Sequence, residues 1–242
     1  INIAIRQRLE VRAQHSVNNS SNYAAPLKQV WDRLDSIHAN TVEVPVAWEQ
    51  LEPKEGQFDY SFDRLADVIE GFTDALSLDR YTLYVFDYGA PVGLRLATRH
   101  PDRVTAIISQ NGNAYEEGLS DGWADMRKAW AEPTAENRAA LRHFNTADMI
   151  KWQYLEGVSD TSLIAPETYQ LAYAAIDRIG VEPQVDLLVD YGQNIKQYNQ
   201  LHDYFRRYQP PLLAIWGDKD PFFLPAGAHA FKRDNPKAEV RF

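Results

Sequence analysis

Two short runs of apolar residues, Tyr81–Asp87 and Val104–Gln110, constrain the fold of this chain more than any other feature. Each run is apolar on both faces, and the stretch between them, Ala90–Arg99, has the pattern of a helix. Strands that are apolar on both faces and separated by helices are typical of a parallel sheet covered by helices. The sequence therefore predicts an α/β fold with a mostly parallel sheet and flanking helices.

The same alternation extends to both sides of this pair. Further strands are predicted at Thr41–Ala47, Pro211–Trp216 and Ala238–Phe242, and further helices at 24–38, after Ser61, and at 224–233. From 114 to 208 no strand pattern persists, and this segment is typical of an inserted helical cap. Its helical stretches are broken at Pro133, Gly157, Pro166, Gly180 and Pro183. Its aromatic residues fit an apolar pocket closed by a lid: Trp123, Trp130, Trp152, Tyr154, Tyr169, Tyr173, Tyr198 and Tyr204.

Composition excludes several classes of function. With 34 Asp and Glu against 25 Lys and Arg, the formal charge of −9 argues against nucleic acid or an anionic membrane as the main partner. The absence of Cys excludes disulfides, zinc ribbons and thiol nucleophiles. No apolar run approaches the roughly 18 residues of a membrane span, and Ile1–Glu10 lacks a signal-peptide core. We expect a soluble, cytoplasmic protein that acts on a small molecule; the oligomeric state is not predicted.

The segment from Tyr84 to Gly93 carries the candidate chemistry. Its strand ends in Asp87, and Gly89 supplies the small residue that a sharp strand-to-helix turn needs. Such a turn would project the Asp87 carboxylate from the carboxyl edge of the sheet, where open α/β sheets bind ligands. An ionised carboxylate there can attack an sp³ carbon and form an alkyl ester, which a His–acid pair then hydrolyses. The alternative is an Asp that only caps the next helix.

The residues around Asp87 resemble the α/β-hydrolase family over about 65–242. The closest branch is that of haloalkane dehalogenases and epoxide hydrolases, in which Val-X-Asp-(Trp/Tyr)-Gly-(Gly/Ala) carries an Asp nucleophile. Val85-Phe86-Asp87-Tyr88-Gly89-Ala90 matches this pattern. The segment from Ile215 to Phe223 matches a second family motif, and Asp220 falls on its catalytic acid, the alternative being a cap for the helix after Pro221. The resemblance implies no cofactor and no metal ion.

Two parts of the family pattern are absent. The family's catalytic His follows the last strand, whereas this chain ends at Phe242 as that strand begins, and none of its six His has this context. No His-Gly pair follows an early strand, so the Tyr88 amide is the only plausible oxyanion donor. Losing one such donor typically costs about 2.7–4 kcal/mol of transition-state stabilisation. Tyr88 also replaces the halide-binding Trp of dehalogenases, which favours epoxide or ester substrates.

A different family resembles the N-terminal part. Asn18–Ser21 and Asn40–Tyr60 are similar to β-galactosidase-like glycoside hydrolases with a (β/α)₈ barrel. This resemblance places Trp48, Glu49 and Glu52 at strand-end positions that help to bind sugar, the alternative being a solvated acidic loop. The two resemblances together divide the chain into a glycosidase-like segment (1–64), an α/β-hydrolase core (65–113 and 209–242) and the helical cap (114–208).

Three functional interpretations remain open at this point. The first is an α/β-hydrolase-type enzyme that attacks an epoxide, haloalkane or related small apolar substrate through an aspartyl ester. Asp87 and Asp220 would then be catalytic, with activity limited by the missing His. The second is a sugar-binding, glycoside hydrolase-like fragment. The third is a non-catalytic fusion or truncated protein.

Overall fold

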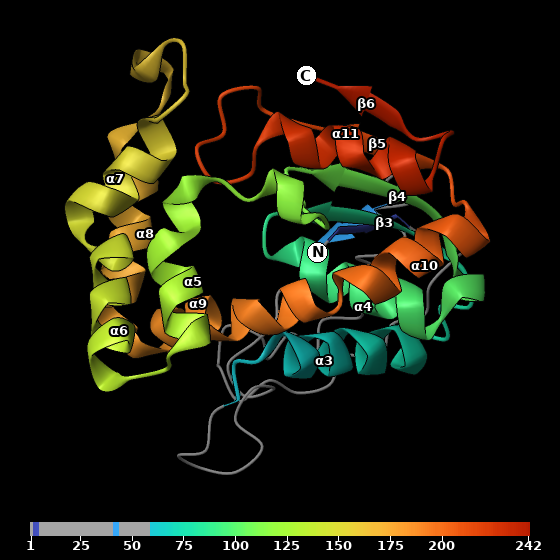
Figure 1. Ribbon diagram of the computed structural model, residues 1–242, viewed down its shortest axis with the longest axis horizontal. Helices are drawn as coiled ribbons and strands as arrows, with labels where there is room; N and C mark the ends of the chain where they lie inside the picture. Colours follow the sequence, from blue (N-terminus) through green and yellow to red (C-terminus); the bar gives the residue numbers. More distant parts are fainter. Residues whose placement is uncertain (1, 5–40, 44–58) are drawn as a thin grey trace, which may run out of the picture.

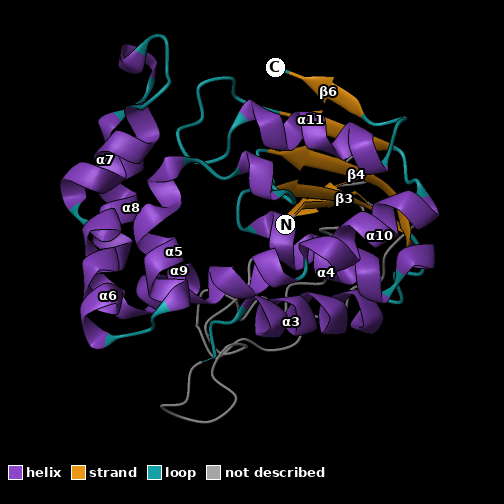
Figure 2. Ribbon diagram, in the orientation of Figure 1, coloured by secondary structure: helices purple, strands orange, loops and turns teal. Residues whose placement is uncertain are grey.

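One mixed sheet organises the part of the chain that the computed structural model describes, residues 2–4, 41–43 and 59–242. Its strand order is β2-β1-β3-β4-β5-β6 (Figures 1 and 2). Neighbours from β3 to β6 run parallel, whereas β1 runs antiparallel to β2 and β3. The predicted α/β fold with a mostly parallel sheet is confirmed. The strands are β1 Asn2–Ala4, β2 Thr41–Glu43, β3 Tyr81–Phe86, β4 Val104–Gln110, β5 Leu212–Ile215 and β6 Glu239–Arg241.

The predicted strands beyond residue 80 coincide with the observed ones to within one residue at each end. In β3, Tyr81, Leu83 and Val85 are buried, because the strand lies inside the sheet between β1 and β4. Of the strand predicted at Thr41–Ala47, only Thr41–Glu43 is described, as β2. Strand β1 was not predicted. The helix predicted at 24–38 lies outside the described residues.

Four helices pack around the sheet, and their bounds are α3 Phe62–Ala75, α4 Gly89–Arg99, α10 Tyr198–Tyr208 and α11 Pro225–Asp234. Helix α4 packs on β3 and α11 packs on β5 and β6, while α3 and α10 lie against α4. As predicted, Ser61 caps α3: its hydroxyl accepts a hydrogen bond from the Arg64 amide at 3.1 Å. These contacts fix α4, which begins directly after Asp87.

The segment between β4 and β5 is helical, and α5 to α9 gather at one side of the sheet (Figure 1). The predicted breaks fall at helix ends; α8, for example, begins at Pro166 and is capped by Gly180. The longer helices are α5 Ala124–Ala131, α6 Ala135–Ala140, α7 Ala147–Leu155, α8 Pro166–Ile179 and α9 Glu182–Lys196. The short 3-10 helices are η1 Pro101–Arg103, η2 Glu116–Gly118, η3 Asp121–Trp123, η4 Leu141–Asn145 and η5 Thr161–Leu163.

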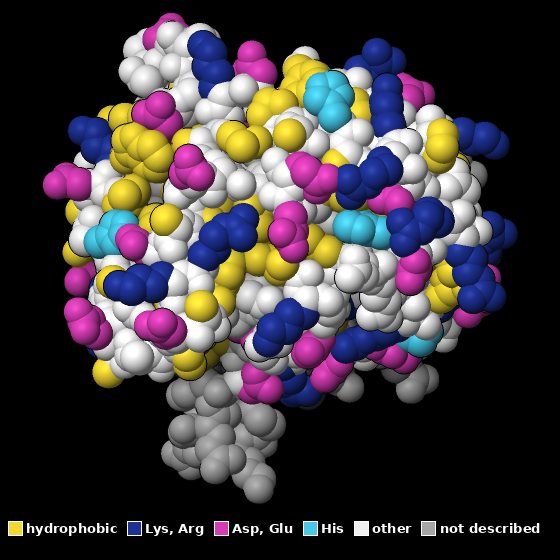
Figure 3. All heavy atoms as spheres, in the orientation of Figure 1, with side chains coloured by type: hydrophobic (Ala, Val, Ile, Leu, Met, Phe, Trp, Pro, Cys, Tyr) yellow, Lys and Arg dark blue, Asp and Glu magenta, His cyan; other side chains and the backbone are white. Residues whose placement is uncertain are grey.

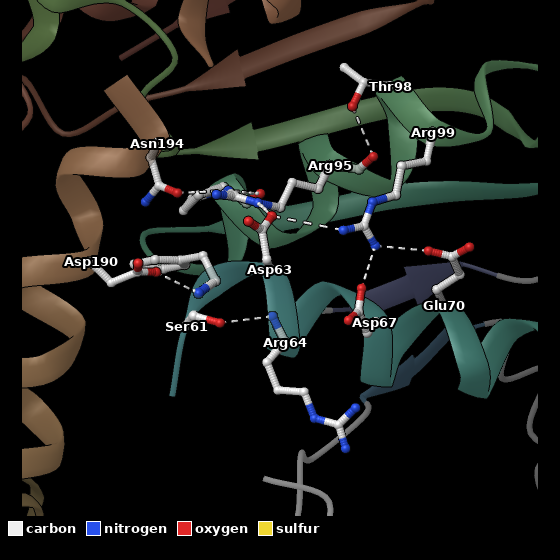
Figure 4. A network of polar contacts seen from close by, with 12 residues as sticks. Ser61, Asp63, Arg64, Asp67, Glu70, Arg95, Thr98, Arg99, Asp190 and Asn194 are labelled. Atoms are coloured by element: carbon white, nitrogen blue, oxygen red, sulfur yellow. Dashed lines mark hydrogen bonds and ion pairs between the residues drawn. The ribbon is translucent and has the colours of Figure 1, made fainter. Parts of the chain in front are cut away.

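A polar network joins α9 to the helices beside the sheet (Figure 4). Arg95 on α4 is only 3% exposed, and its guanidinium donates to Asp63 on α3 and to Asn194 on α9, both at 2.6 Å. Asp190 on α9 accepts a hydrogen bond from the Phe62 amide at 2.7 Å. Because hydrogen bonds to charged groups contribute about 1.5–3 kcal/mol each, this network anchors α9 firmly to α3 and α4.

The surface mixes charges of both signs with apolar side chains, which are visible over α5 to α9 and between these helices and the sheet (Figure 3). Large exposed apolar residues include Trp152 and Tyr154 on α7 and Leu171 on α8. Within the described ranges, no helix combines the length and the apolar character that crossing a membrane requires.

Candidate active site

The turn after β3 holds Asp87 in an uncommon backbone conformation. Its φ is +46°, in the left-handed region that non-glycine residues rarely adopt. The Asp87 carbonyl accepts a hydrogen bond from the Ala90 amide at 2.9 Å, and α4 starts within this turn. Helix α4 packs so closely on β3 that a Cβ at Gly93 would lie 2.5 Å from Val85 Cγ1. Strain of this kind persists only where surrounding contacts fix the backbone, and it is common at active sites.

The surroundings of Asp87 raise the pKa of its carboxyl group from 3.8 to about 6. The main cause is burial among protein atoms, and the nearby charge of Asp220 adds to it; a hydrogen bond from the Tyr88 amide acts in the opposite direction. The side chain is nevertheless exposed, because its free surface faces a cavity. At neutral pH the carboxylate is therefore mostly ionised, accessible and poorly solvated.

Asp220 lies in the loop after β5 and lines the same cavity as Asp87. Its Oδ1 accepts hydrogen bonds from the amides of Phe222 at 2.8 Å and Phe223 at 2.9 Å. Its Oδ2 accepts a hydrogen bond from Asn111 Nδ2 at 2.5 Å. The two amides belong to the loop before α11, and the N-cap of that helix is Leu224, so Asp220 does not cap the helix after Pro221. The structure thus brings the two predicted carboxylates together and holds Asp220 in place with three donors.

Asn111 was not predicted as a site residue. It follows β4 directly, has a φ of +45°, and lines the cavity. Its side-chain Nδ2 donates to Asp220, and its Oδ1 accepts a hydrogen bond from the Gly217 amide at 3.2 Å. Its backbone amide donates to the Ile215 carbonyl at 3.0 Å. Its position at the carboxyl end of a parallel strand, next to the Asp87 strand, was the available signal.

The cavity above Asp87 has a volume of about 600 Å³ and lies between the sheet edge and the cap helices. Of the cap aromatics predicted to line a pocket, Trp123 and Tyr154 do so. Phe222 and Phe223, from the loop after β5, line it as well. The Trp123 ring packs against Phe223 at 5.3 Å between centroids. Aromatic and aliphatic side chains thus share the lining of this cavity with polar and charged ones.

Tyr88 lies beside Asp87 and lines the cavity. Its ring packs edge-on against Phe62, with 5.4 Å between centroids, and is tilted by 38° to the Tyr191 ring of α9, with 5.6 Å between centroids. Burial and the neighbouring Asp87 charge raise the pKa of its hydroxyl group above the ordinary value. The Tyr88 amide is the hydrogen-bond donor that the sequence predicts at this site, and its contribution to the pKa of Asp87 places it beside the carboxylate.

None of the four His within residues 59–242 lines the cavity. The His100 ring bonds to Glu70 at 2.7 Å, and the His143 ring to the Ala140 carbonyl at 2.6 Å. His202 stacks on Tyr115 and bonds to the Ala114 carbonyl, and His229 lies against Phe242. The remaining two, at 15 and 38, fall outside the described residues.

The sugar-binding positions predicted from the N-terminal resemblance, Trp48, Glu49 and Glu52, also lie outside the described residues. In the part that is described, no three His, Cys, Asp or Glu side chains are grouped so that they could hold a metal ion.

Comparison with known proteins now decides the family. The sequence profile of the "alpha/beta hydrolase fold" family matches residues 45–242. The chain belongs to this family. The match begins before residue 65, where the hydrolase core was predicted to start. The resemblance of the N-terminal segment to glycoside hydrolases gains no support from these comparisons.

Two curated relatives extend this assignment. An uncharacterized hydrolase of Saccharomyces cerevisiae is 37% identical over 188 residues, which cover 76% of this chain and 65% of the yeast protein. Haloalkane dehalogenase 1 of Mycobacterium bovis is 35% identical over 176 residues, which cover 72% of this chain and 56% of that protein. The chain thus spans less than two thirds of the length of either relative.

Solved structures show the same fold. A meta-cleavage product hydrolase from Pseudomonas fluorescens superposes with a TM-score of 0.53 at 18% identity, covering 77% of this chain and 64% of that one. A haloalkane dehalogenase from Agrobacterium tumefaciens gives a TM-score of 0.54 at 19% identity, covering 78% and 67%. This α/β-hydrolase therefore shares its architecture with enzymes of different chemistry.

Proposed function

We propose that this α/β-hydrolase attacks a small apolar substrate through an aspartyl ester. An oxygen of the Asp87 carboxylate forms a bond to an sp³ carbon of the substrate, and the bond from that carbon to its leaving group breaks. The electron pair departs with a halide ion from a haloalkane, or stays on the opened oxygen of an epoxide, which then takes up a proton. Asp220 is proposed as the acid that orients the base of the second step.

One observation carries this proposal: an ionisable carboxylate stands on a left-handed strand-to-helix turn and faces a cavity that aromatic and aliphatic side chains partly line. Its raised pKa reflects poor solvation, which makes the ionised form more reactive toward a neutral electrophile. A carboxylate that only capped α4 would need neither the cavity nor the left-handed backbone.

The leaving group is a narrower proposal. The similarity to haloalkane dehalogenase 1 of Mycobacterium bovis supports a haloalkane. Tyr88, which stands where the resemblance places a halide-binding Trp, favours an epoxide instead. We expect a terminal epoxide to alkylate Asp87 faster than a terminal bromoalkane of the same length.

The second step needs a base that activates water against the ester. The four described His lie outside the cavity, so we expect the alkyl ester of this 242-residue chain to accumulate and its hydrolysis to be slow.

Intact-mass spectrometry tests this proposal directly. The protein is incubated at pH 8 with octene oxide or n-octyl bromide, and the Asp87→Asn variant serves as the control. A single added substrate mass that is absent from the variant supports the proposal. Continuous release of product without an adduct would show that a base does reach the ester. If neither an adduct nor a product forms, the result would favour a non-catalytic protein.

A further inference from the structure

The dipeptide Asn111-Gly112, directly after β4, has a reactivity of its own. No other Asn of the 242-residue sequence is followed by Gly. In such a pair the backbone nitrogen of the Gly can attack Cγ of the Asn, since the Gly has no side chain to hinder the approach. The N–Cγ bond forms and the Cγ–Nδ2 bond breaks, and ammonia leaves with the proton of the Gly amide. Water then opens the resulting five-membered succinimide ring and yields Asp or isoAsp.

Two hydrogen bonds hold the side-chain amide of Asn111. Its Nδ2 donates to Asp220 Oδ2 at 2.5 Å, and its Oδ1 accepts from the Gly217 amide at 3.2 Å. Ring closure brings Cγ to bonding distance of the Gly112 nitrogen, so the side-chain amide has to leave both partners. A hydrogen bond to a charged group such as the Asp220 carboxylate slows this step by about tenfold or more.

The backbone of the dipeptide is held as well. The Asn111 amide donates to the Ile215 carbonyl at 3.0 Å, and the Gly112 carbonyl accepts from the Ser109 hydroxyl at 2.8 Å. Gly112 is buried, and a Cβ there would lie 2.5 Å from Ser109 Oγ and 2.7 Å from Ala90 Cβ. Rotation of the backbone toward the side chain of Asn111 is therefore restricted in the folded protein.

Deamidation would change the candidate active site. Asn111 lines the same cavity as Asp87 and Asp220. An acidic oxygen in place of Nδ2 removes a donor to Asp220 and brings two like charges together, which is unfavourable. IsoAsp in addition lengthens the backbone by one methylene group at the turn after β4. Either product would leave Asp220 with two of its three hydrogen-bond donors.

We propose that Asn111-Gly112 is a deamidation site inside the cavity, and that Asp220 controls the reaction by holding the Asn111 side chain. Asp220 then protects its own hydrogen-bond partner, in addition to the role proposed for it above. Because no reaction at Asp87 is involved, this inference and the proposed function can fail separately.

Peptide mass spectrometry tests this inference. The parent and Asp220→Asn are kept at pH 8 for several weeks, and exchange of NH₂ for OH at Asn111 is followed by mass. The oxygen of the new amide can still accept from the Phe222 and Phe223 amides, but its NH₂ group cannot accept from Asn111 Nδ2. We expect the parent to deamidate at least about tenfold more slowly than the chain unfolded in urea, and Asp220→Asn about tenfold faster than the parent.

Two controls separate this effect from other consequences of mutation. Asp218→Asn removes a carboxylate from the same loop and cavity, but Asp218 is not one of the two partners of the Asn111 side chain. Ile69→Val lowers stability at a buried position of α3 and leaves the loop unchanged. Both variants are expected to deamidate at the rate of the parent.

Gly217→Pro provides a second release of the same side chain, because it removes the amide that donates to Asn111 Oδ1. It is expected to accelerate deamidation while Asp220 stays in place. Gly217→Ala is its matched control, because it keeps the amide and its Cβ would lie 3.8 Å from Asn111 Nδ2, an ordinary contact.

The inference is overturned if the folded parent deamidates at Asn111 as fast as the unfolded chain. It is also overturned if Asp220→Asn deamidates no faster than Asp218→Asn, or if Ile69→Val accelerates the reaction as much as Asp220→Asn does. Equal rates for Gly217→Pro and Gly217→Ala would likewise contradict control by the hydrogen bonds of the Asn111 side chain.

Discussion

The turns after β3 and β5 each present a carboxylate to the same cavity, but they hold it in opposite ways. Asp220 accepts three hydrogen bonds, from Asn111 and from the amides of Phe222 and Phe223. Asp87 has a left-handed backbone, and the Tyr88 amide only partly offsets the effect of burial on its pKa. Donors therefore immobilise Asp220, whereas the Asp87 carboxylate remains accessible from the cavity.

The largest effect is expected on the rate at which a substrate alkylates Asp87. Asp87→Asn is expected to reduce adduct formation with octene oxide by more than about a thousandfold, because the attacking oxygen anion is removed. Asp220→Asn is expected to keep alkylation within about tenfold of the parent, because Asp220 does not form the ester. Intact-mass time courses measure both rates, and equal losses in the two variants would abolish the distinction.

The two carboxylates are also expected to affect stability with opposite signs. Asp220→Ala is expected to lower the free energy of unfolding by about 2 kcal/mol, because it leaves the Phe222 and Phe223 amides and the Asn111 side chain without this acceptor. Urea unfolding at pH 7 measures this loss. An unchanged midpoint would mean that the three hydrogen bonds around Asp220 stabilise nothing.

Asp87 is expected to destabilise the fold at high pH. Its pKa of about 6 lies above the ordinary 3.8, so the folded state binds its proton more tightly than the unfolded state does. The resulting stability is fully present below pH 4 and is lost as the pH rises through 6. Asp87→Asn should therefore melt at a higher temperature than the parent at pH 8 and at a similar temperature at pH 4. A lower melting temperature at pH 8 would contradict the poor solvation of this carboxylate.

The alkylation rate is expected to depend on the ionisation of Asp87. The rate is expected to rise with pH and to reach half its maximum near pH 6, where Asp87 loses its proton. Asp220→Asn removes the second cause of the raised pKa and should move this midpoint to lower pH. Rates with octene oxide between pH 4.5 and 8.5 provide the test, and a midpoint that Asp220→Asn leaves in place would show that the two charges do not interact.

The smallest expected effect concerns the packing of the cap on the loop that carries Asp220. Gly157 has a φ of +76°, and a Cβ there would lie 2.8 Å from the Lys219 carbonyl oxygen. Gly157→Ala is expected to lower the free energy of unfolding by about 1–2 kcal/mol, because the added Cβ strains the backbone and pushes the cap away from Lys219. Gly71→Ala on α3 is the control, since a Cβ there meets no atom within 4 Å, and it should be neutral or stabilising. Thermal unfolding distinguishes the two.

Sequence patterns located the sheet and both carboxylates because these depend on local features. The apolar runs define β3 and β4, and the small residues after Asp87 define the turn. Strand β1 has only three residues, Asn2–Ala4, so its pairing with β3 depends on contacts that are distant in sequence. Three residues are too few to show the hydrophobic pattern that predicts a strand.

The lining of the cavity could be predicted only in part. Trp123 and Trp152 belong to the same helical segment, yet Trp123 lines the cavity and Trp152 is 38% exposed. Which side of each short helix faces inward is decided by packing between helices. Asn111 was missed because its role depends on Asp220, which is 109 residues away in sequence.

The most direct test of the nucleophile is to locate the bound substrate. After incubation with octene oxide at pH 8, the protein is digested and its peptides are sequenced by tandem mass spectrometry. We predict a single ester on Asp87, which mild alkali removes. Modification of Asp220 in its place, or an unmodified Asp87 peptide after prolonged incubation, would contradict the assignment of Asp87 as the nucleophile.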